Sequence, residues 1–180
     1  IDEIMEYNRK FVENKGYEPY LTSKYPDKKL AILTCMDTRL LELLPAALGI
    51  KNGDAKIIKN AGGVIVHPYG SVVRSLLVGI LELGVEEVMV IGHTDCGVQG
   101  MDGNEMLEKL VERGIDQQHI DIVRHSGIDL ERWLGGFESV ESSVHETVRR
   151  LKEHPLMPKN VRISGFIMDS ATGELTRVEE

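Results

Sequence analysis

Two cysteines, a histidine and an aspartate–arginine pair are the residues whose types and spacing could carry chemistry. They occur in two short segments, Cys35-Met36-Asp37-Thr38-Arg39 and His93-Thr94-Asp95-Cys96. A lone His-x-x-Cys is weak evidence, because polar turns contain it by chance, and Cys35 alone is typical of a small buried apolar residue. Together, two soft thiolates and one imidazole favour zinc over magnesium or calcium. Three protein ligands leave the fourth zinc position open, as in a catalytic site.

Asp37 and Arg39 follow the first cysteine directly, and their opposite charges predict a pair. Held by Arg39, Asp37 could accept a hydrogen bond from a hydroxide on zinc and orient it towards a substrate. Asp37 could also be an alternative fourth zinc ligand, which would close the site. A simpler alternative makes Asp37 a helix cap and Arg39 a solvated surface residue. The adjacent cysteine favours the catalytic interpretation.

The segments that must position these side chains alternate between strands and helices. Five strands are predicted, over residues 30–35, 56–58, 87–92, 161–167 and 174–178. Because most are apolar on both faces, we expect an α/β fold: a mainly parallel four-stranded sheet with helices on both faces and a fifth, antiparallel edge strand. If the second strand flanks the first on the outside, the first and third are neighbours. Their carboxyl ends then bring Cys35, His93 and Cys96 together.

Helical patterns fill most of the remaining sequence. They cover residues 1–12, 40–48, 72–83 and most of 103–153, with a break at Gly135-Gly136. Pro45 predicts a kink or a restart in the second of these helices, and Ser71 is the expected cap of the third. Residues 1–16 predict an N-terminal helix that packs on a partner subunit or on its own domain.

Length and composition predict a single α/β domain over residues 1–180. The chain is 42% apolar and 28% charged, which is typical of a globular protein. Its 21 basic and 29 acidic residues give a net charge of -8, so we expect no nucleic-acid partner. The sequence has neither a membrane-spanning apolar stretch nor a secretory signal pattern, which predicts a cytoplasmic protein with no membrane partner. A chain that begins at Ile1 leaves residues before it open.

The two chemical segments resemble the signatures of the β-class carbonic anhydrases, Cys-x-Asp-x-Arg after one strand and His-x-x-Cys after another. The segment Lys59-Asn60-Ala61-Gly62 is similar to that family's Asn-Ala-Gly segment. The similarity is specific from about Leu30 to Gly97, looser as far as Gly165, and the short chain is similar to the compact microbial branch. Thr38 and Gly63 depart from the family pattern, which predicts a pocket loop of different shape.

This resemblance implies zinc as the cofactor, Cys35, His93 and Cys96 as its ligands, and Asp37 and Arg39 as catalytic residues. It also implies a homodimer or a higher homo-oligomer. The expected reaction is the reversible hydration of carbon dioxide, a small-molecule substrate, to bicarbonate by attack of zinc-bound hydroxide. The residues expected to line the substrate pocket are Asn60, Ala61, Gly62 and Gly97.

Other polar residues are given no role in this chemistry. Asp95 is expected to be a turn residue rather than a ligand. Four histidines lie in polar segments typical of solvated side chains, so we nominate none as a proton shuttle: His67, His119, His125 and His154.

Three alternative functions use the same residues. Some members of the compact microbial branch hydrolyse carbon disulfide or carbonyl sulfide with the same zinc constellation. Cys35 and Cys96 could instead form a redox thiol pair or a peroxide sensor, although no Cys-x-x-Cys motif is present and the histidine is then left without a task. A non-catalytic regulator with a structural zinc is the third alternative, and the open coordination position argues against it.

Overall fold

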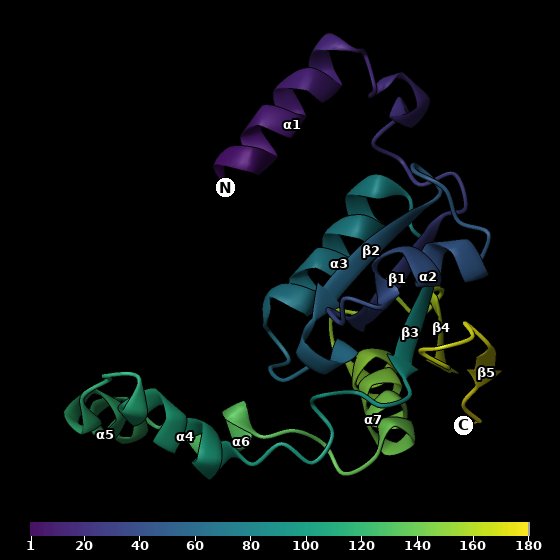
Figure 1. Ribbon diagram of the computed structural model, residues 1–180. Helices are drawn as coiled ribbons and strands as arrows, with labels where there is room; N and C mark the ends of the chain where they lie inside the picture. Colours follow the sequence, from purple (N-terminus) through teal and green to yellow (C-terminus); the bar gives the residue numbers. More distant parts are fainter. Residues whose placement is uncertain (180) are drawn as a thin grey trace.

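The centre of the molecule, a computed structural model that describes residues 1–179, is a five-stranded sheet (Figure 1). The strand order is β2-β1-β3-β4-β5, with β1 at Leu30–Cys35, β2 at Ala55–Asn60, β3 at Glu87–His93, β4 at Arg162–Met168 and β5 at Leu175–Arg177. The first four strands are parallel, and β5 pairs with β4 in the antiparallel direction. The predicted fold class is therefore confirmed, with β2 outside β1 and with β1 next to β3.

The register of the sheet determines which strand ends meet. Cys35, the last residue of β1, is paired with Asn60 of β2, and Thr34 is paired with Ile91 of β3. β3 continues past Ile91 and ends at His93. Because parallel strands end on the same side of a sheet, Cys35 and His93 come to the same edge.

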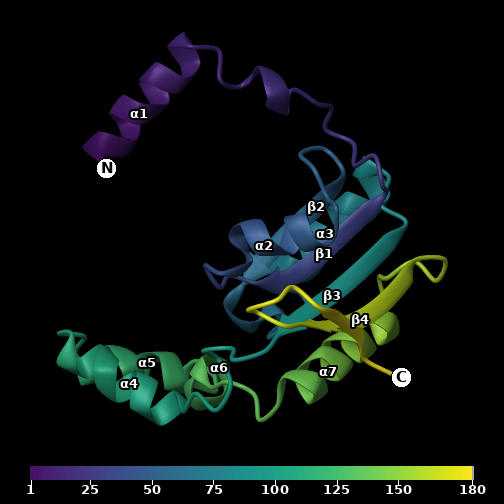
Figure 2. The same ribbon diagram turned by 45° about the vertical axis from the view of Figure 1, so that its right-hand side comes forward.

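Helices cover both faces of the sheet, as predicted. α3 (Ser71–Leu83) and α7 (Val140–Glu153) pack on one face, and α2 (Leu40–Ala47) packs on the other (Figures 1 and 2). Successive strand residues point to opposite faces, so Leu33 joins the core with α3 and α7, whereas Ile32 joins the core with α2. Packing on both faces therefore holds the strand that carries Cys35.

Three short helices between β3 and α7 form a group of their own. They are α4 (Gly103–Glu112), α5 (Gln117–His125) and α6 (Leu130–Leu134), and they lie away from the sheet in both views (Figures 1 and 2). A small apolar cluster holds them together: Leu107, Ile120 and Leu130. Each helix begins after an aspartate whose side chain accepts a backbone hydrogen bond from the first turn, namely Asp102, Asp116 and Asp129.

The N-terminal helix α1 (Asp2–Glu13) also lies apart from the sheet (Figures 1 and 2). A short 3₁₀ segment, η1 (Glu18–Tyr20), lies between it and β1. None of the described residues of α1 is buried, and most of its apolar side chains are exposed, namely Ile4, Met5 and Val12, as is Ile1 just before the helix; Phe11 is half-buried. The single chain therefore leaves the apolar side of this helix facing solvent.

Several local expectations differ from the structure. Gly70, not Ser71, is the N-cap of α3, and Ser71 is the first helical residue. α2 runs unbroken through Pro45, so it does not restart there. Proline has no N–H to donate to the carbonyl of Leu41, but Leu41 is exposed, so water is available to that carbonyl. β2 is longer than residues 56–58, because its polar end pairs with the end of β1. Among the described residues, no helix is long and apolar enough to cross a bilayer.

Candidate metal centre

Cys35, His93 and Cys96 converge at the carboxyl edge of β1 and β3. Their candidate ligand atoms all lie within 4.8 Å of one another, and all three residues are buried. The two Sγ atoms are 3.9 Å apart. Tetrahedral zinc with Zn–S bonds of about 2.3 Å separates two sulfurs by about 3.8 Å. The arrangement of the thiols therefore matches what zinc requires.

The imidazole of His93 is arranged as a metal ligand. Its Nδ1 atom donates to the carbonyl oxygen of Thr94 at 2.9 Å, which places the lone pair of the neutral ring on Nε2. Nε2 is buried and has no hydrogen-bond partner among the described residues. An unsatisfied buried polar atom costs about 1–3 kcal/mol, so a group that binds Nε2 removes a real penalty. The donor set therefore fits a zinc ion.

The electrostatics of the thiols point the same way. Burial raises the pKa of the Cys96 thiol, and the neighbouring Cys35 raises it further. A bound cation reverses this preference, because a metal-coordinating thiol is deprotonated. Lys59 lies close enough to interact with Cys35, although burial lowers the pKa of its ammonium group. A divalent ion at the centre of the cluster would therefore favour the thiolate form of Cys96, which burial alone disfavours.

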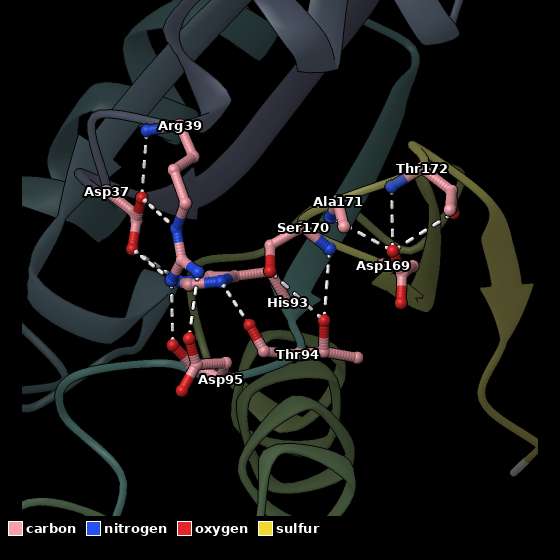
Figure 3. A network of polar contacts seen from close by, with 9 residues as sticks. All are labelled: Asp37, Arg39, His93, Thr94, Asp95, Asp169, Ser170, Ala171 and Thr172. Carbon is pink, nitrogen blue, oxygen red and sulfur yellow. Dashed lines mark hydrogen bonds and ion pairs between the residues drawn. The ribbon is translucent and has the colours of Figure 1, made fainter.

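Asp37 and Arg39 form a pair beside the cluster (Figure 3). Oδ1 of Asp37 accepts from Nε of Arg39 at 3.0 Å, and Oδ2 accepts from Nη2 at 2.9 Å. Oδ1 also accepts from the backbone N–H of Arg39 at 2.9 Å, so Asp37 closes the turn before α2 as a cap would. These bonds hold the pKa of Asp37 well below its usual range. Because Oδ2 lies 3.8 Å from Nε2 of His93, the carboxylate borders the expected metal position.

Asp95 is a second carboxylate on the same guanidinium, which the sequence analysis missed. Its φ of 54° is left-handed, as expected of a turn residue. Its carbonyl oxygen accepts from Nη2 of Arg39 at 2.8 Å, and its Oδ2 accepts from Nη1 at 2.9 Å (Figure 3). The contact joins residues 56 positions apart, so no local sequence signal could reveal it.

The predicted pocket residues lie on two loops beside the cluster. The side chain of Asn60 donates to the carbonyl of Val64 and accepts from its N–H, which closes the loop around η2 (Ala61–Gly63). Gly62 is buried within this loop, and Gly97 is exposed next to Cys96. Asn60 is thus committed to loop geometry, while the two glycines carry no side chain into the space beside the metal position.

Gly63 explains one departure from the expected family pattern. Its φ is +66°, and a Cβ there would lie 3.0 Å from the backbone N of Cys35. Glycine therefore allows the loop to pack directly against the strand end that carries Cys35.

Among the described residues, none of the histidines outside the cluster makes a contact with it. His154 was expected to be solvated, yet it is buried: its Nε2 pairs with the carbonyl of Pro68, and its Nδ1 accepts from the N–H of Leu156. This histidine therefore ties the end of α7 to the loop before α3, and it is a structural residue.

Comparisons with known proteins agree with this geometry. A family model described as carbonic anhydrase matches residues 30–175. The chain is 53% identical over 172 residues to the protein YvdA of Bacillus subtilis, covering 96% of this chain and 87% of that protein. It is 31% identical over 158 residues to a carbon disulfide hydrolase of Acidithiobacillus thiooxidans, covering 83% and 76% of the two chains. The crystal structure of β-carbonic anhydrase isoform I from Trichomonas vaginalis superposes with a TM-score of 0.88 at 35% identity, covering 98% of this chain and 96% of that one.

Proposed function

The chain belongs to the β-class carbonic anhydrase family, and on that basis we propose that it hydrates carbon dioxide reversibly to bicarbonate with zinc held by Cys35, His93 and Cys96. One observation carries the proposal: a ring nitrogen of His93 and two thiol sulfurs lie within 4.8 Å of one another, and the buried Nε2 of that ring has no hydrogen-bond partner among residues 1–179. Two thiolates and an imidazole suit zinc, and three protein ligands leave one position for chemistry.

Zinc, when bound, acts as a Lewis acid and supplies a hydroxide nucleophile near neutral pH. The residues of the chain orient this chemistry. Asp37 is an ionised acceptor whose pKa Arg39 lowers further, so it would accept a hydrogen bond from the hydroxide and direct it towards the substrate carbon. Arg39 fixes the carboxylate through two side-chain hydrogen bonds. The reaction moves protons and no electrons, so it needs no redox partner.

The apolar surroundings of the cluster suit an uncharged, linear substrate. Val98 and Phe137 are partly buried and pack against the core cluster that contains Cys35 and Cys96. Such side chains exclude water from the space next to the open position and leave an apolar surface for carbon dioxide. We expect Ala61, Gly62 and Gly97 to complete this pocket through their backbone.

Hydrolysis of carbon disulfide or carbonyl sulfide is the second candidate. It is supported by the relatives named carbon disulfide hydrolase, one of which is 32% identical over 163 residues. Both substrates are linear molecules with an electrophilic central carbon, so the same residues would act on them. The higher similarity to the Bacillus subtilis protein, 53% against 32%, does not itself separate the two activities.

One experiment separates these candidates. Zinc-loaded protein is assayed by stopped flow with carbon dioxide and, side by side, with carbon disulfide, and its zinc content is measured. Rapid hydration of carbon dioxide at one zinc per chain supports the proposal. Turnover of carbon disulfide alone favours the second candidate. A metal-free protein whose two thiols titrate reversibly with peroxide would instead favour the redox alternative.

We expect the active form to be a homodimer in which α1 packs on the partner subunit. An isolated helix of 12 residues is marginal in water, and α1 exposes its apolar side in the single chain. Light scattering after gel filtration tests this, with Ile4→Glu expected to shift the protein towards monomer. Lys10→Gln is the control, because it makes the net charge more negative by the same amount at an exposed polar residue of the same helix. The single-domain organisation and the cytoplasmic location stay predictions from the sequence.

A further inference from the structure

Thr94, the residue after His93, is tied to the turn between β4 and β5 (Figure 3). Its backbone N–H donates to the carbonyl of Met168 at 3.0 Å. Its Oγ1 accepts from the backbone N–H of Ser170 at 3.0 Å and lies 3.2 Å from the hydroxyl oxygen of Ser170. One contact from the end of β4 and two from the turn that follows it therefore fix both the backbone and the side chain of this single residue.

The fixed residue in turn orients the metal site. The carbonyl of Thr94 accepts the Nδ1–H of His93 at 2.9 Å, so the direction of this carbonyl sets the rotation of the imidazole ring. The carbonyl of the next residue, Asp95, accepts from Arg39 at 2.8 Å. The carbonyl of Thr94 thus holds His93, a proposed zinc ligand. The carbonyl of Asp95 holds Arg39, which in turn holds Asp37.

The turn that supports Thr94 is itself well ordered by hydrogen bonds. Oδ1 of Asp169 accepts from the N–H of Ala171 at 2.9 Å and from the N–H of Thr172 at 2.7 Å. The hydroxyl of Thr172 is 3.0 Å from the same oxygen. The N–H of Asp169 donates to the carbonyl of Glu174 at 2.8 Å, which closes the turn. Ser170 is therefore presented to Thr94 from a fixed backbone.

Burial does not force these contacts. Thr94 is exposed, so water is available to its hydroxyl, and a solvated side chain would meet the same hydrogen-bonding needs. The contacts to Met168 and Ser170 instead fix the position of the loop after β3, because they connect it to a separate part of the chain.

We propose that Thr94 is a positioning residue for His93, held by the β4–β5 turn through Ser170, and that its hydroxyl is needed for tight retention of the metal. The inference rests on the proposed zinc site. Loss of the hydroxyl leaves the three ligands and the backbone bond to Met168 in place, but it removes both contacts to Ser170 that restrain the residue whose carbonyl orients the imidazole. Groups that orient a metal ligand typically account for a 10–100-fold difference in metal affinity or activity.

The test compares zinc release from zinc-loaded wild type and five variants: Thr94→Val, Thr94→Ser, Thr176→Val, Ser170→Ala and the double variant Thr94→Val/Ser170→Ala. Thr94→Val deletes the hydroxyl at nearly constant volume, and Thr94→Ser keeps it. Thr176→Val is the matched control, because it makes the same substitution at an exposed residue of β5 that takes no part in the contacts of Thr94. The readouts are the rate of zinc transfer to a chromophoric chelator, the ligand-field spectrum of the cobalt-substituted protein, and the melting temperature without metal.

Thr94→Val is expected to release zinc on the order of 10-fold faster and to alter the cobalt spectrum. Thr94→Ser and Thr176→Val are expected to behave like wild type, with similar metal-free melting temperatures for all the proteins compared. Ser170→Ala, which keeps the backbone bond to Thr94, is expected to give a smaller acceleration and to add nothing on top of Thr94→Val.

The inference would be overturned if Thr94→Val released zinc at the wild-type rate, if Thr176→Val accelerated release equally, or if Thr94→Ser failed to restore retention. None of these results depends on turnover, so they leave the proposed function standing. A wild-type protein that binds no zinc refutes both proposals, whereas one that retains zinc through Thr94 but hydrates no carbon dioxide refutes the proposed function alone.

Discussion

Replacement of Arg39 by alanine tests the role of the ion pair most directly. Arg39 supplies every hydrogen bond found for the Asp37 carboxylate among the described residues, two from its side chain and one from its backbone. The variant keeps the backbone bond and loses the two charged ones. Because Oδ2 of Asp37 lies 3.8 Å from Nε2 of His93, the released carboxylate can reach the open metal position.

The expected result of Arg39→Ala is a fall in kcat/KM for carbon dioxide of roughly 10–100-fold with zinc content unchanged, the range typical of groups that orient metal sites. Protonation cannot explain such a loss. Arg39 lowers the pKa of Asp37, and removing it returns that pKa towards about 3.9, so the carboxylate is ionised at pH 7 with or without the arginine. The fall in rate is therefore expected to be the same at pH 7 and at pH 8.5.

The assay is stopped-flow hydration with zinc determined on the same samples. Arg39→Lys keeps the charge but offers a point donor in place of a planar fork, so it is expected to recover only part of the rate. Arg124→Ala removes an arginine that is paired with Glu131 in the α4–α6 group and is expected to have no effect on hydration. Full turnover by zinc-replete Arg39→Ala would refute the orienting role, and loss of zinc together with activity would show that the pair retains the metal instead.

Three further outcomes are expected. Gly63→Ala should destabilise the protein by roughly 1–3 kcal/mol more than Gly49→Ala in urea unfolding. Both glycines have positive φ, but only a Cβ at position 63 meets the backbone of Cys35. Equal losses of stability in the two variants would contradict this. Glu146 has a pKa lowered to about 2 by Arg149 and Arg150, so its stabilisation is present above its ordinary pKa and is lost as the pH falls towards 2. Glu146→Gln should thus melt below wild type at pH 7, and the two should converge near pH 2. Zinc at about 100 times its Kd should add about 2.7 kcal/mol, or about 5–10 °C in melting temperature, and a chelator should remove this gain; Cys35→Ser should show no such shift.

The sheet and the convergence of Cys35, His93 and Cys96 could be predicted from sequence because each depends on short, continuous segments. A buried parallel strand is apolar on both faces, so the run from Leu30 to Cys35 can be recognised as a strand from its sequence. The strand order then places the end of this strand beside His93. The contacts of Asp95 with Arg39 and of Thr94 with Ser170 could not be predicted, because they depend on the relative positions of loops from different strands.

Other differences had a usable signal in the sequence. The region 103–153 was read as mostly helical with one break, yet Asp102, Asp116 and Asp129 each precede a helix and accept backbone bonds from its first turn. Aspartate before an amphipathic run is a recognised start signal, so these boundaries were within reach. Ser71 was given that role wrongly, because serine is also accepted at the first helical position, with glycine before it as the cap.

The proposed ligands stand on backbone that the apolar core holds in place independently of any cation. Cys35 ends a strand in which Ile32 and Leu33 are fully buried, and His93 ends one in which Ile91 is fully buried. Zinc fingers lack such a core and unfold without metal. Here the sheet and its helices supply the folding energy, so metal binding adds stability to a chain that is already folded. A structural zinc site closes its shell with four protein ligands, whereas a preformed set of three keeps its open position without collapse of the fold, which is what catalysis at that position requires.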